Sequence, residues 1–410
     1  MTSDVVRLHV NARAAPRDEP YARTHDAILA TADFDAANAV VRSWPGYQPT
    51  PLHTLPARAK ALGVDALYYK DESHRFGLGS FKPSGGAYAV ALVLLRELKD
   101  RGVVAEPTIQ ALLAGDYRDA VAEITITSAT DGNHGRAVAW GAAMFGCRSV
   151  IFIHEAVSEG RRAAIAAYGA EVVRVSGGYD DSVRHAFATA RANGWHVVQD
   201  TATADYRQAP ADITCGYGVL AREIVEEMST PPTHVFVQAG VGGLASAVCA
   251  AFWQAWGARR PRFIVFEPAT ADCVLRSLAA GRPEVVPGDA HTFMAGLACG
   301  EISLIAWDIL RDGADAAVAI DDDFAREGMR ALAAPLGNDP VIVGGECSGG
   351  ALGALTALAE RPEMMRALEI GPQSRVLLIG TEGATDPDIY REIVGCTAEE
   401  VMAQRRNSSP

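Results

Sequence analysis

One lysine, Lys82, lies in a segment whose composition suits covalent chemistry. The segment 77–86 is rich in glycine and serine, follows a β-like run at 67–70 and opens an Ala/Val/Leu-rich helical pattern. At a helix start, unpaired backbone N–H groups and the helix dipole disfavour an extra positive charge. The pattern therefore favours a neutral amine, the nucleophile that Schiff-base formation requires. A solvated lysine at a helix start is the ordinary alternative.

A glycine-rich segment opens another helix, directly after a predicted strand at 235–237. Such glycines let backbone N–H groups close on a phosphate at the helix N-terminus. The segment matches neither GxGxxG nor a Walker loop, so a small phosphate monoester fits better than a dinucleotide or a nucleoside triphosphate. A tight strand–helix turn explains the same glycines. The candidate residues are Gly240, Val241, Gly242, Gly243 and Leu244.

A second strand–helix loop, residues 128–135, combines a carboxylate, an amide and an imidazole. Asp131 can act as an acid or a base, and Asn133 can hydrogen-bond a ligand. A capped helix start, with Asp131 or Asn133 as the N-cap, is the alternative. A histidine placed like His134 is more often structural than functional.

Two further polar residues follow predicted strands. Asp200 comes after a strand at 196–198, as a loop residue, an N-cap or a second carboxylate of the site. Thr381 follows a strand at 376–379, where its neutral hydroxyl can bond a heterocyclic nitrogen. A plain turn before Pro387 is the alternative for Thr381.

These loops belong to a regular alternation of strands and helices. Short β-branched runs separated by helical stretches of about 10–15 residues indicate βαβ units on a parallel sheet. In open parallel sheets, ligands bind at the carboxyl ends of the strands, where these loops lie. Residues 1–20 and 46–55 are expected to be irregular. The predicted strands are 67–70, 124–127, 149–153, 171–175, 196–198, 235–237, 263–266 and 376–379.

The length and the net charge of the chain exclude several classes of protein. The 410 residues suffice for two domains or one large α/β unit. A formal net charge of -13 argues against a nucleic-acid or anionic-membrane surface, because both need clustered Lys and Arg. The N-terminus lacks a signal-peptide pattern, and no apolar run is long enough to span a membrane. We therefore expect a cytoplasmic protein with a small-molecule substrate.

Seven cysteines are scattered along the chain without a CxxC pair or a Cys/His set at zinc spacing. The sequence therefore predicts no metal site. Cys273 and Cys299 can form a bridge, although free buried thiols are the usual state in a cytosolic protein.

Taken together, these segments resemble a known family. A Ser-Phe-Lys with glycines soon after it, an Asn-His-Gly loop and then a glycine-rich phosphate loop is the order of fold-type II pyridoxal-phosphate (PLP) enzymes, such as threonine dehydratase. The chain is most similar to the diaminopropionate ammonia-lyase family, and the resemblance runs from about residue 45 to about residue 395. The matching segments are 81–88, 130–136, 179–184, 199–202, 294–301 and 381–387.

The resemblance implies an α/β fold of two open, twisted, mostly parallel sheets flanked by helices. A small domain, 87–199, would be inserted into a large PLP-binding domain, 1–86 and 200–410. It also implies that Lys82 holds PLP as a Schiff base and acts as a base on Cα. The segment 240–244 would cradle the phosphate, Asn133 would bond the phenolic oxygen, and Thr381 would bond the pyridine nitrogen. A homodimer and the possibility of a Cys273–Cys299 pair are likewise implied by the family.

The same resemblance implies the reaction. Asp131 would be a second base that extends the activity from L- to D-substrates. Asp200 would engage a distal ammonium group, because a carboxylate favours ammonium over hydroxyl. The implied activity is α,β-elimination of ammonia from 2,3-diaminopropionate, giving pyruvate and ammonia. The alternatives are a threonine or serine dehydratase with the same cofactor chemistry, and an inactive ligand-binding relative. The residues after Lys82 and after Asp200 differ from those of typical relatives, and the resemblance implies that these differences fall near the substrate.

Overall fold

A computed structural model describes residues 5–130 and 132–407, with side chains described up to residue 403. Two compact units make up the chain. The large unit comprises Met1–Thr31, Gln48–Phe81 and Leu220–Pro410, and the small unit comprises Ala32–Tyr47 and Lys82–Val219. The domain boundaries expected from the family resemblance stay a prediction.

The large unit contains a seven-stranded sheet in the order β1-β10-β9-β8-β11-β3-β2. The five central strands are parallel, whereas β1 and β2 pair antiparallel at the two edges. The central strands are almost entirely buried, which is typical of a parallel sheet covered on both faces. The strands are β1 (Val6–Val10), β2 (Leu52–Thr54), β3 (Ala66–Asp71), β8 (His234–Gln238), β9 (Arg262–Pro268), β10 (Ala316–Ile320) and β11 (Arg375–Gly380).

Helices cover this sheet. The helix α15 packs across β8 to β11, α14 packs on α15, and α11 and α12 contact β8 and β9, respectively. The helices are α1 (Arg23–Asp26), α3 (Pro56–Leu62), η1 (Glu72–Gly77), α11 (Gly243–Trp256), η2 (Gly257–Arg259), α12 (Cys273–Ala280), η3 (Ala295–Leu297), α13 (Leu304–Gly313), α14 (Asp322–Ala333), α15 (Glu346–Ala359), α16 (Pro362–Ala367), α17 (Pro387–Val394) and α18 (Ala398–Asn407).

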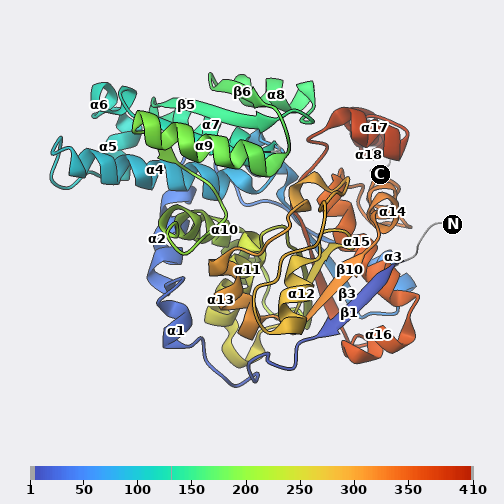
Figure 1. The fold of residues 1–410 in the computed structure, drawn as a ribbon. Helices are drawn as coiled ribbons and strands as arrows, with labels where there is room; N and C mark the ends of the chain where they lie inside the picture. Colours follow the sequence, from blue (N-terminus) through green and yellow to red (C-terminus); the bar gives the residue numbers. More distant parts are fainter. Residues whose placement is uncertain (1–4, 131, 408–410) are drawn as a thin grey trace. The chain divides into compact units, whose positions relative to one another are not determined.

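The small unit contains a parallel four-stranded sheet in the order β6-β5-β4-β7. The helices α7 and α9 pack on this sheet, and α4 packs on α7 (Figure 1). The strands are β4 (Thr125–Ala129), β5 (Arg148–His154), β6 (Glu171–Val175) and β7 (His196–Val197). The helices are α2 (Thr31–Arg42), α4 (Lys82–Asp100), α5 (Ile109–Ala114), α6 (Arg118–Ala122), α7 (Asn133–Phe145), α8 (Glu159–Ala166), α9 (Tyr179–Asn193) and α10 (Gln208–Glu227), whose last turns belong to the large unit.

All eight predicted strands are present, but three strands were missed. The expectation that residues 1–20 and 46–55 are irregular is wrong for β1 and β2. The strand β10 is not predicted from the sequence, because its residues Ala-Ala-Val-Ala-Ile have a weak β propensity. It forms because β1 and β9 pair with its two edges, and Val6 lies opposite Ile320. Figure 1 shows β1 and β10 side by side. Pairing between segments this distant in the chain leaves no local signal.

Candidate active site

Lys82 is the first residue of α4, as the sequence pattern predicts. The preceding residue, Phe81, donates its backbone N–H to the Thr381 carbonyl oxygen at 3.0 Å within the large unit. Close packing also surrounds the glycines after the lysine, because a Cβ on Gly85 would lie 2.4 Å from the Ile213 carbonyl oxygen. The start of α4 therefore requires glycine where it meets α10.

The Lys82 ammonium is paired with a carboxylate. Its Nζ lies 2.7 Å from Asp200 Oδ2 and 5.4 Å from the centre of the Tyr217 ring. Burial by itself lowers the pKa of Lys82. The negative charge of Asp200 has the opposite effect, and the net result is a pKa of Lys82 above its ordinary value. Burial likewise opposes the charge of Asp200, while the Lys82 ammonium lowers the pKa of Asp200 below its usual range. The expectation of a neutral amine is therefore corrected, because the neighbouring carboxylate overrides the helix-start effect.

His134 lies near the same oxygen of Asp200. Its Nε2 is 2.9 Å from the Val198 carbonyl oxygen, and its Nδ1 is 4.0 Å from Asp200 Oδ2. Burial lowers the pKa of His134, so the ring is neutral near pH 7. The structure thus brings Lys82, Asp200 and His134 together within the small unit.

The loop before α7 is held by Thr130, to which the sequence analysis assigns no role. The Thr130 hydroxyl accepts hydrogen bonds from the backbone N–H groups of Gly132 and Gly135, each at 3.0 Å. Asn133 is the first residue of α7 and Gly132 is its N-cap, so the alternative of Asn133 as the N-cap is wrong. Asp131 lies outside the described residues.

A buried glutamine, Gln199, positions the chain just before Asp200. Its Oε1 accepts hydrogen bonds from the Ser128 hydroxyl at 2.9 Å and the Ala129 N–H at 3.2 Å. Its Nε2 donates to the Tyr179 hydroxyl at 2.6 Å. Gln199 therefore ties the end of β4 and the start of α9 to the segment that carries Asp200.

The predicted phosphate loop lies in the large unit, between β8 and α11. A Cβ on Gly240 would meet the Gly296 carbonyl oxygen at 2.8 Å and Cys299 Sγ at 2.9 Å. Gly242 has a φ of 88°, a left-handed conformation that favours glycine. The backbone N–H groups of residues 240–244 donate to no acceptor among the described residues. Unpaired N–H groups at the start of a 14-residue helix suit a phosphate group.

Thr381 follows β11 and is oriented by Gln238, a second residue that the sequence reasoning missed. Gln238 Nε2 lies 3.2 Å from the Cys347 carbonyl oxygen and 2.7 Å from Thr381 Oγ1. A carbonyl only accepts, so the nitrogen end of the amide faces both partners and Thr381 Oγ1 accepts its hydrogen bond. The Thr381 hydroxyl proton is therefore left to donate elsewhere. A neutral donor of this kind suits an unprotonated ring nitrogen.

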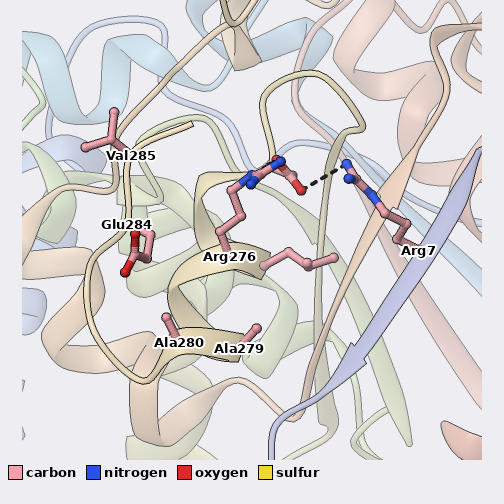
Figure 2. Close-up of a pocket in the computed structure, with 8 residues that line it drawn as sticks. Arg7, Arg276, Ala279, Ala280, Glu284 and Val285 are labelled. Carbon is pink, nitrogen blue, oxygen red and sulfur yellow. Dashed lines mark hydrogen bonds and ion pairs between the residues drawn. The ribbon is translucent and has the colours of Figure 1, made fainter. Parts of the chain in front are cut away.

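The large unit also holds two cysteines near Gly240 and a separate pocket. Cys273 and Cys299 carry thiols and are not joined in a disulfide, and Cys273 Sγ lies 3.4 Å from the Gly240 carbonyl oxygen. A pocket of about 350 Å³ is bordered by Arg7 and α12, with Asp272 bonded to Arg7 at 2.9 Å and to Arg276 at 2.6 Å (Figure 2). None of the predicted site residues lines this pocket. The described residues contain no group of His, Cys, Asp and Glu that could hold a metal, and no helix able to cross a membrane.

Comparisons with known proteins agree with this chemistry. A family model described as pyridoxal-phosphate dependent enzyme matches residues 43–382. The chain is 42% identical over 356 residues to diaminopropionate ammonia-lyase of Escherichia coli (strain K12), covering 85% of this chain and 88% of that protein. Two crystal structures of the Escherichia coli enzyme are also similar. The complex with D-serine has a TM-score of 0.86 at 37% identity, covering 96% of this chain and 97% of that chain.

The second structure is the complex with an aminoacrylate-PLP azomethine reaction intermediate. It has a TM-score of 0.85 at 37% identity, with the same coverage. The chain is therefore a fold-type II enzyme that uses pyridoxal phosphate. Within that class, it belongs to the diaminopropionate ammonia-lyase family. The expected α/β fold, the cofactor and the family are thereby confirmed.

Proposed function

We propose that this chain eliminates ammonia from 2,3-diaminopropionate, giving pyruvate and ammonia. The observation that carries the proposal is the Lys82–Asp200 pair, which places an amine and a carboxylate 2.7 Å apart in a largely buried setting. An amine can form a Schiff base with the aldehyde of the cofactor. A carboxylate can bind the ammonium group of the substrate. The names of the relatives support the same reaction.

The residues that would hold the cofactor fit its functional groups. Lys82 Nζ would bind the aldehyde carbon, and the free N–H groups of residues 240–244 would bind the phosphate. Asn133 would hydrogen-bond the phenolic oxygen. Thr381 would donate its hydroxyl proton to the pyridine nitrogen, because Gln238 already donates to its oxygen. When bound, the cofactor supplies an electron sink for negative charge that develops at Cα.

Two carboxylates would act on the substrate. Asp200 would bind the distal ammonium group once Lys82 is engaged with the cofactor and no longer neutralises it. Lys82 would take the Cα proton of an L-substrate, and Asp131 would take it from the opposite face of a D-substrate. A neutral donor at the ring nitrogen limits charge build-up on the cofactor, which favours elimination over transamination.

Pyruvate release tests the reaction. The purified enzyme would be assayed with L- and D-isomers of 2,3-diaminopropionate, serine and threonine. We expect 2,3-diaminopropionate to react well above the others, and equal rates with serine or threonine (2-oxobutyrate for threonine) would favour a dehydratase. The Lys82→Ala variant should lose both the visible absorption of the bound cofactor and the activity. A wild-type preparation that stays colourless after PLP is added would argue for an inactive relative.

Assembly and location are proposed from the family resemblance. A homodimer predicts twice the chain mass of 43.3 kDa in size-exclusion chromatography with light scattering. A cytoplasmic location predicts recovery in the soluble fraction after osmotic shock.

A further inference from the structure

His134 has one ring nitrogen with a partner and one without. Nε2 lies 2.9 Å from the Val198 carbonyl oxygen, which can only accept, so Nε2 carries the proton of the neutral ring. Nδ1 is then a lone-pair acceptor. No hydrogen-bond partner reaches Nδ1 among the described residues, although only 7% of the side chain is exposed. A buried acceptor without a donor is unfavourable, so its presence beside the proposed site suggests a donor on a ligand.

The geometry around Nδ1 fits one particular kind of donor. Asp200 Oδ2 lies 4.0 Å from His134 Nδ1, and the Lys82 ammonium already lies 2.7 Å from that oxygen. A nitrogen placed about 2.9 Å from each of two acceptors that far apart can bond both. An ammonium group has the several N–H donors that this arrangement needs, whereas a hydroxyl has one.

We infer that His134 Nδ1 and Asp200 together form an acceptor pair for the distal ammonium group of a β-amino substrate, which makes His134 a specificity-determining residue. This inference rests on the proposed function and adds a second recognition group to it. Asp200 supplies the charge, and His134 supplies a neutral acceptor with a defined direction. His134 is neutral because burial lowers its pKa, so its lone pair is available near pH 7.

An acceptor-only pair also decides which leaving group departs readily. When the C–N bond of an ammonium substituent breaks, the electron pair goes to nitrogen and neutral ammonia leaves without a further proton. When the C–O bond of a hydroxyl substituent breaks, the oxygen needs a proton to leave as water. Neither the Asp200 carboxylate nor the unprotonated Nδ1 can give that proton. The pair therefore favours ammonia loss both in binding and in the bond-breaking step.

Two variants distinguish the roles of the two ring nitrogens of His134. In His134→Gln, the amide nitrogen can replace the Nε2 donor to Val198, but the Nδ1 acceptor is lost. In His134→Asn, the amide oxygen lies near the Nδ1 position, but the donor to Val198 is lost. A structural role for His134 predicts more damage from Asn, whereas recognition by Nδ1 predicts more damage from Gln.

A buried histidine of the large unit, His234, is the matched control. Its Nε2 lies 3.0 Å from the Leu368 carbonyl oxygen, but its Nδ1 is bonded to the Thr233 hydroxyl at 2.8 Å. Burial lowers the pKa of His234 as well. The variant His234→Gln therefore reports the general effect of replacing a buried neutral histidine, without removing an acceptor from the proposed site.

The measurement is kcat/KM for L-2,3-diaminopropionate divided by kcat/KM for L-serine, from pyruvate release. We expect His134→Gln to lower this ratio by about tenfold or more, because a hydrogen bond to a charged group contributes roughly that factor. The loss should appear largely in KM for the diamino substrate. His134→Asn and His234→Gln should keep the ratio within about threefold of wild type. Visible absorption of the bound cofactor verifies that each variant is folded and loaded.

The outcomes distinguish the inference from the proposed function. A wild-type enzyme that releases no pyruvate from 2,3-diaminopropionate would overturn both. A wild-type preference for that substrate that persists in His134→Gln would overturn the role of His134 alone. Equal losses in the Gln and Asn variants would also overturn it. If His134→Gln does not fold, His134→Leu, which likewise lacks the acceptor, takes its place with the same expected ratio.

Discussion

Lys82 Nζ and Asp200 Oδ2 lie 2.7 Å apart, although 118 residues separate them in the chain. Each group keeps the other charged against the opposing effect of burial. The pair therefore favours the charged form of the lysine, which is the less nucleophilic one. In the proposed function, cofactor attachment and substrate recognition would be linked through this one carboxylate.

Asp200→Asn should shift the attachment of pyridoxal phosphate to lower pH. Because Asp200 raises the pKa of Lys82, removing its charge leaves burial to lower that pKa. A larger fraction of the amine is then neutral near pH 7, so the half-maximal attachment rate moves down the pH scale. Stopped-flow absorbance over a pH series measures the shift. Asp212→Asn is the control, because Asp212 pairs with Arg96 instead, and an unchanged profile in Asp200→Asn would contradict the coupling.

The same pair should stabilise the fold over a defined pH range. The lowered pKa of Asp200 gives stability that is present above the ordinary carboxyl pKa and lost on acidification. The raised pKa of Lys82 gives stability that is present below the ordinary amine pKa and lost as the pH rises further. The difference in unfolding free energy between wild type and Asp200→Asn should therefore be largest between about pH 5 and pH 9. Urea unfolding of the cofactor-free proteins measures it, and a difference independent of pH would count against the pair.

Gln238→Leu should weaken cofactor binding without abolishing it. The Leu side chain leaves Thr381 without its donor, so the hydroxyl can turn away from the position proposed for the ring nitrogen. One neutral hydrogen bond contributes about 1 kcal/mol, which corresponds to a roughly fivefold rise in the Kd for pyridoxal phosphate. Fluorescence titration of the cofactor-free protein measures this Kd. Gln254→Leu in α11, whose Nε2 bonds the Leu29 carbonyl oxygen, should leave it unchanged.

Gly240→Ala should damage the phosphate loop by steric conflict. The added Cβ would lie 2.8 Å from the Gly296 carbonyl oxygen, and such overpacking costs about 1–3 kcal/mol. We expect weaker binding of pyridoxal phosphate, measured by equilibrium dialysis, and of inorganic phosphate as a competitor. Gly371→Ala is the matched control, because a Cβ there meets nothing within 4 Å. Equal affinities of the two variants would contradict the assignment of the loop.

Arg75→Met should destabilise the large unit strongly. The Arg75 guanidinium bonds Glu72 at 2.7 Å and Glu223 at 2.6 Å, and Lys70 bonds Glu223 at 2.7 Å, all fully buried. Removing Arg75 leaves two buried carboxylates with one cation, and breaking such a network costs about 3–5 kcal/mol. Thermal or urea unfolding measures the loss. Arg148→Met, which breaks an exposed pair with Glu171, should cost about 1 kcal/mol or less, and similar losses in both variants would contradict the prediction.

The sequence by itself determined what depends on neighbouring residues. The alternation of β-branched runs and helical stretches predicts the parallel βαβ units of both sheets, because strand and helix periods are local properties. The glycine-rich loop at 240–244 and the start of α4 at Lys82 are likewise visible along the chain. The order of these segments was enough to identify the family and hence the cofactor.

Only the tertiary structure decided what depends on residues brought together from distant segments. The charge of Lys82 follows from Asp200, and the free acceptor of His134 follows from a bond to Val198. The direction of the Thr381 hydroxyl follows from Gln238, which no motif marks. Local patterns carry no information on such contacts, because a hydrogen bond depends on position in space and not on spacing in the chain. The chemistry was therefore readable from the sequence, whereas the protonation states and the orientation of the groups required the fold.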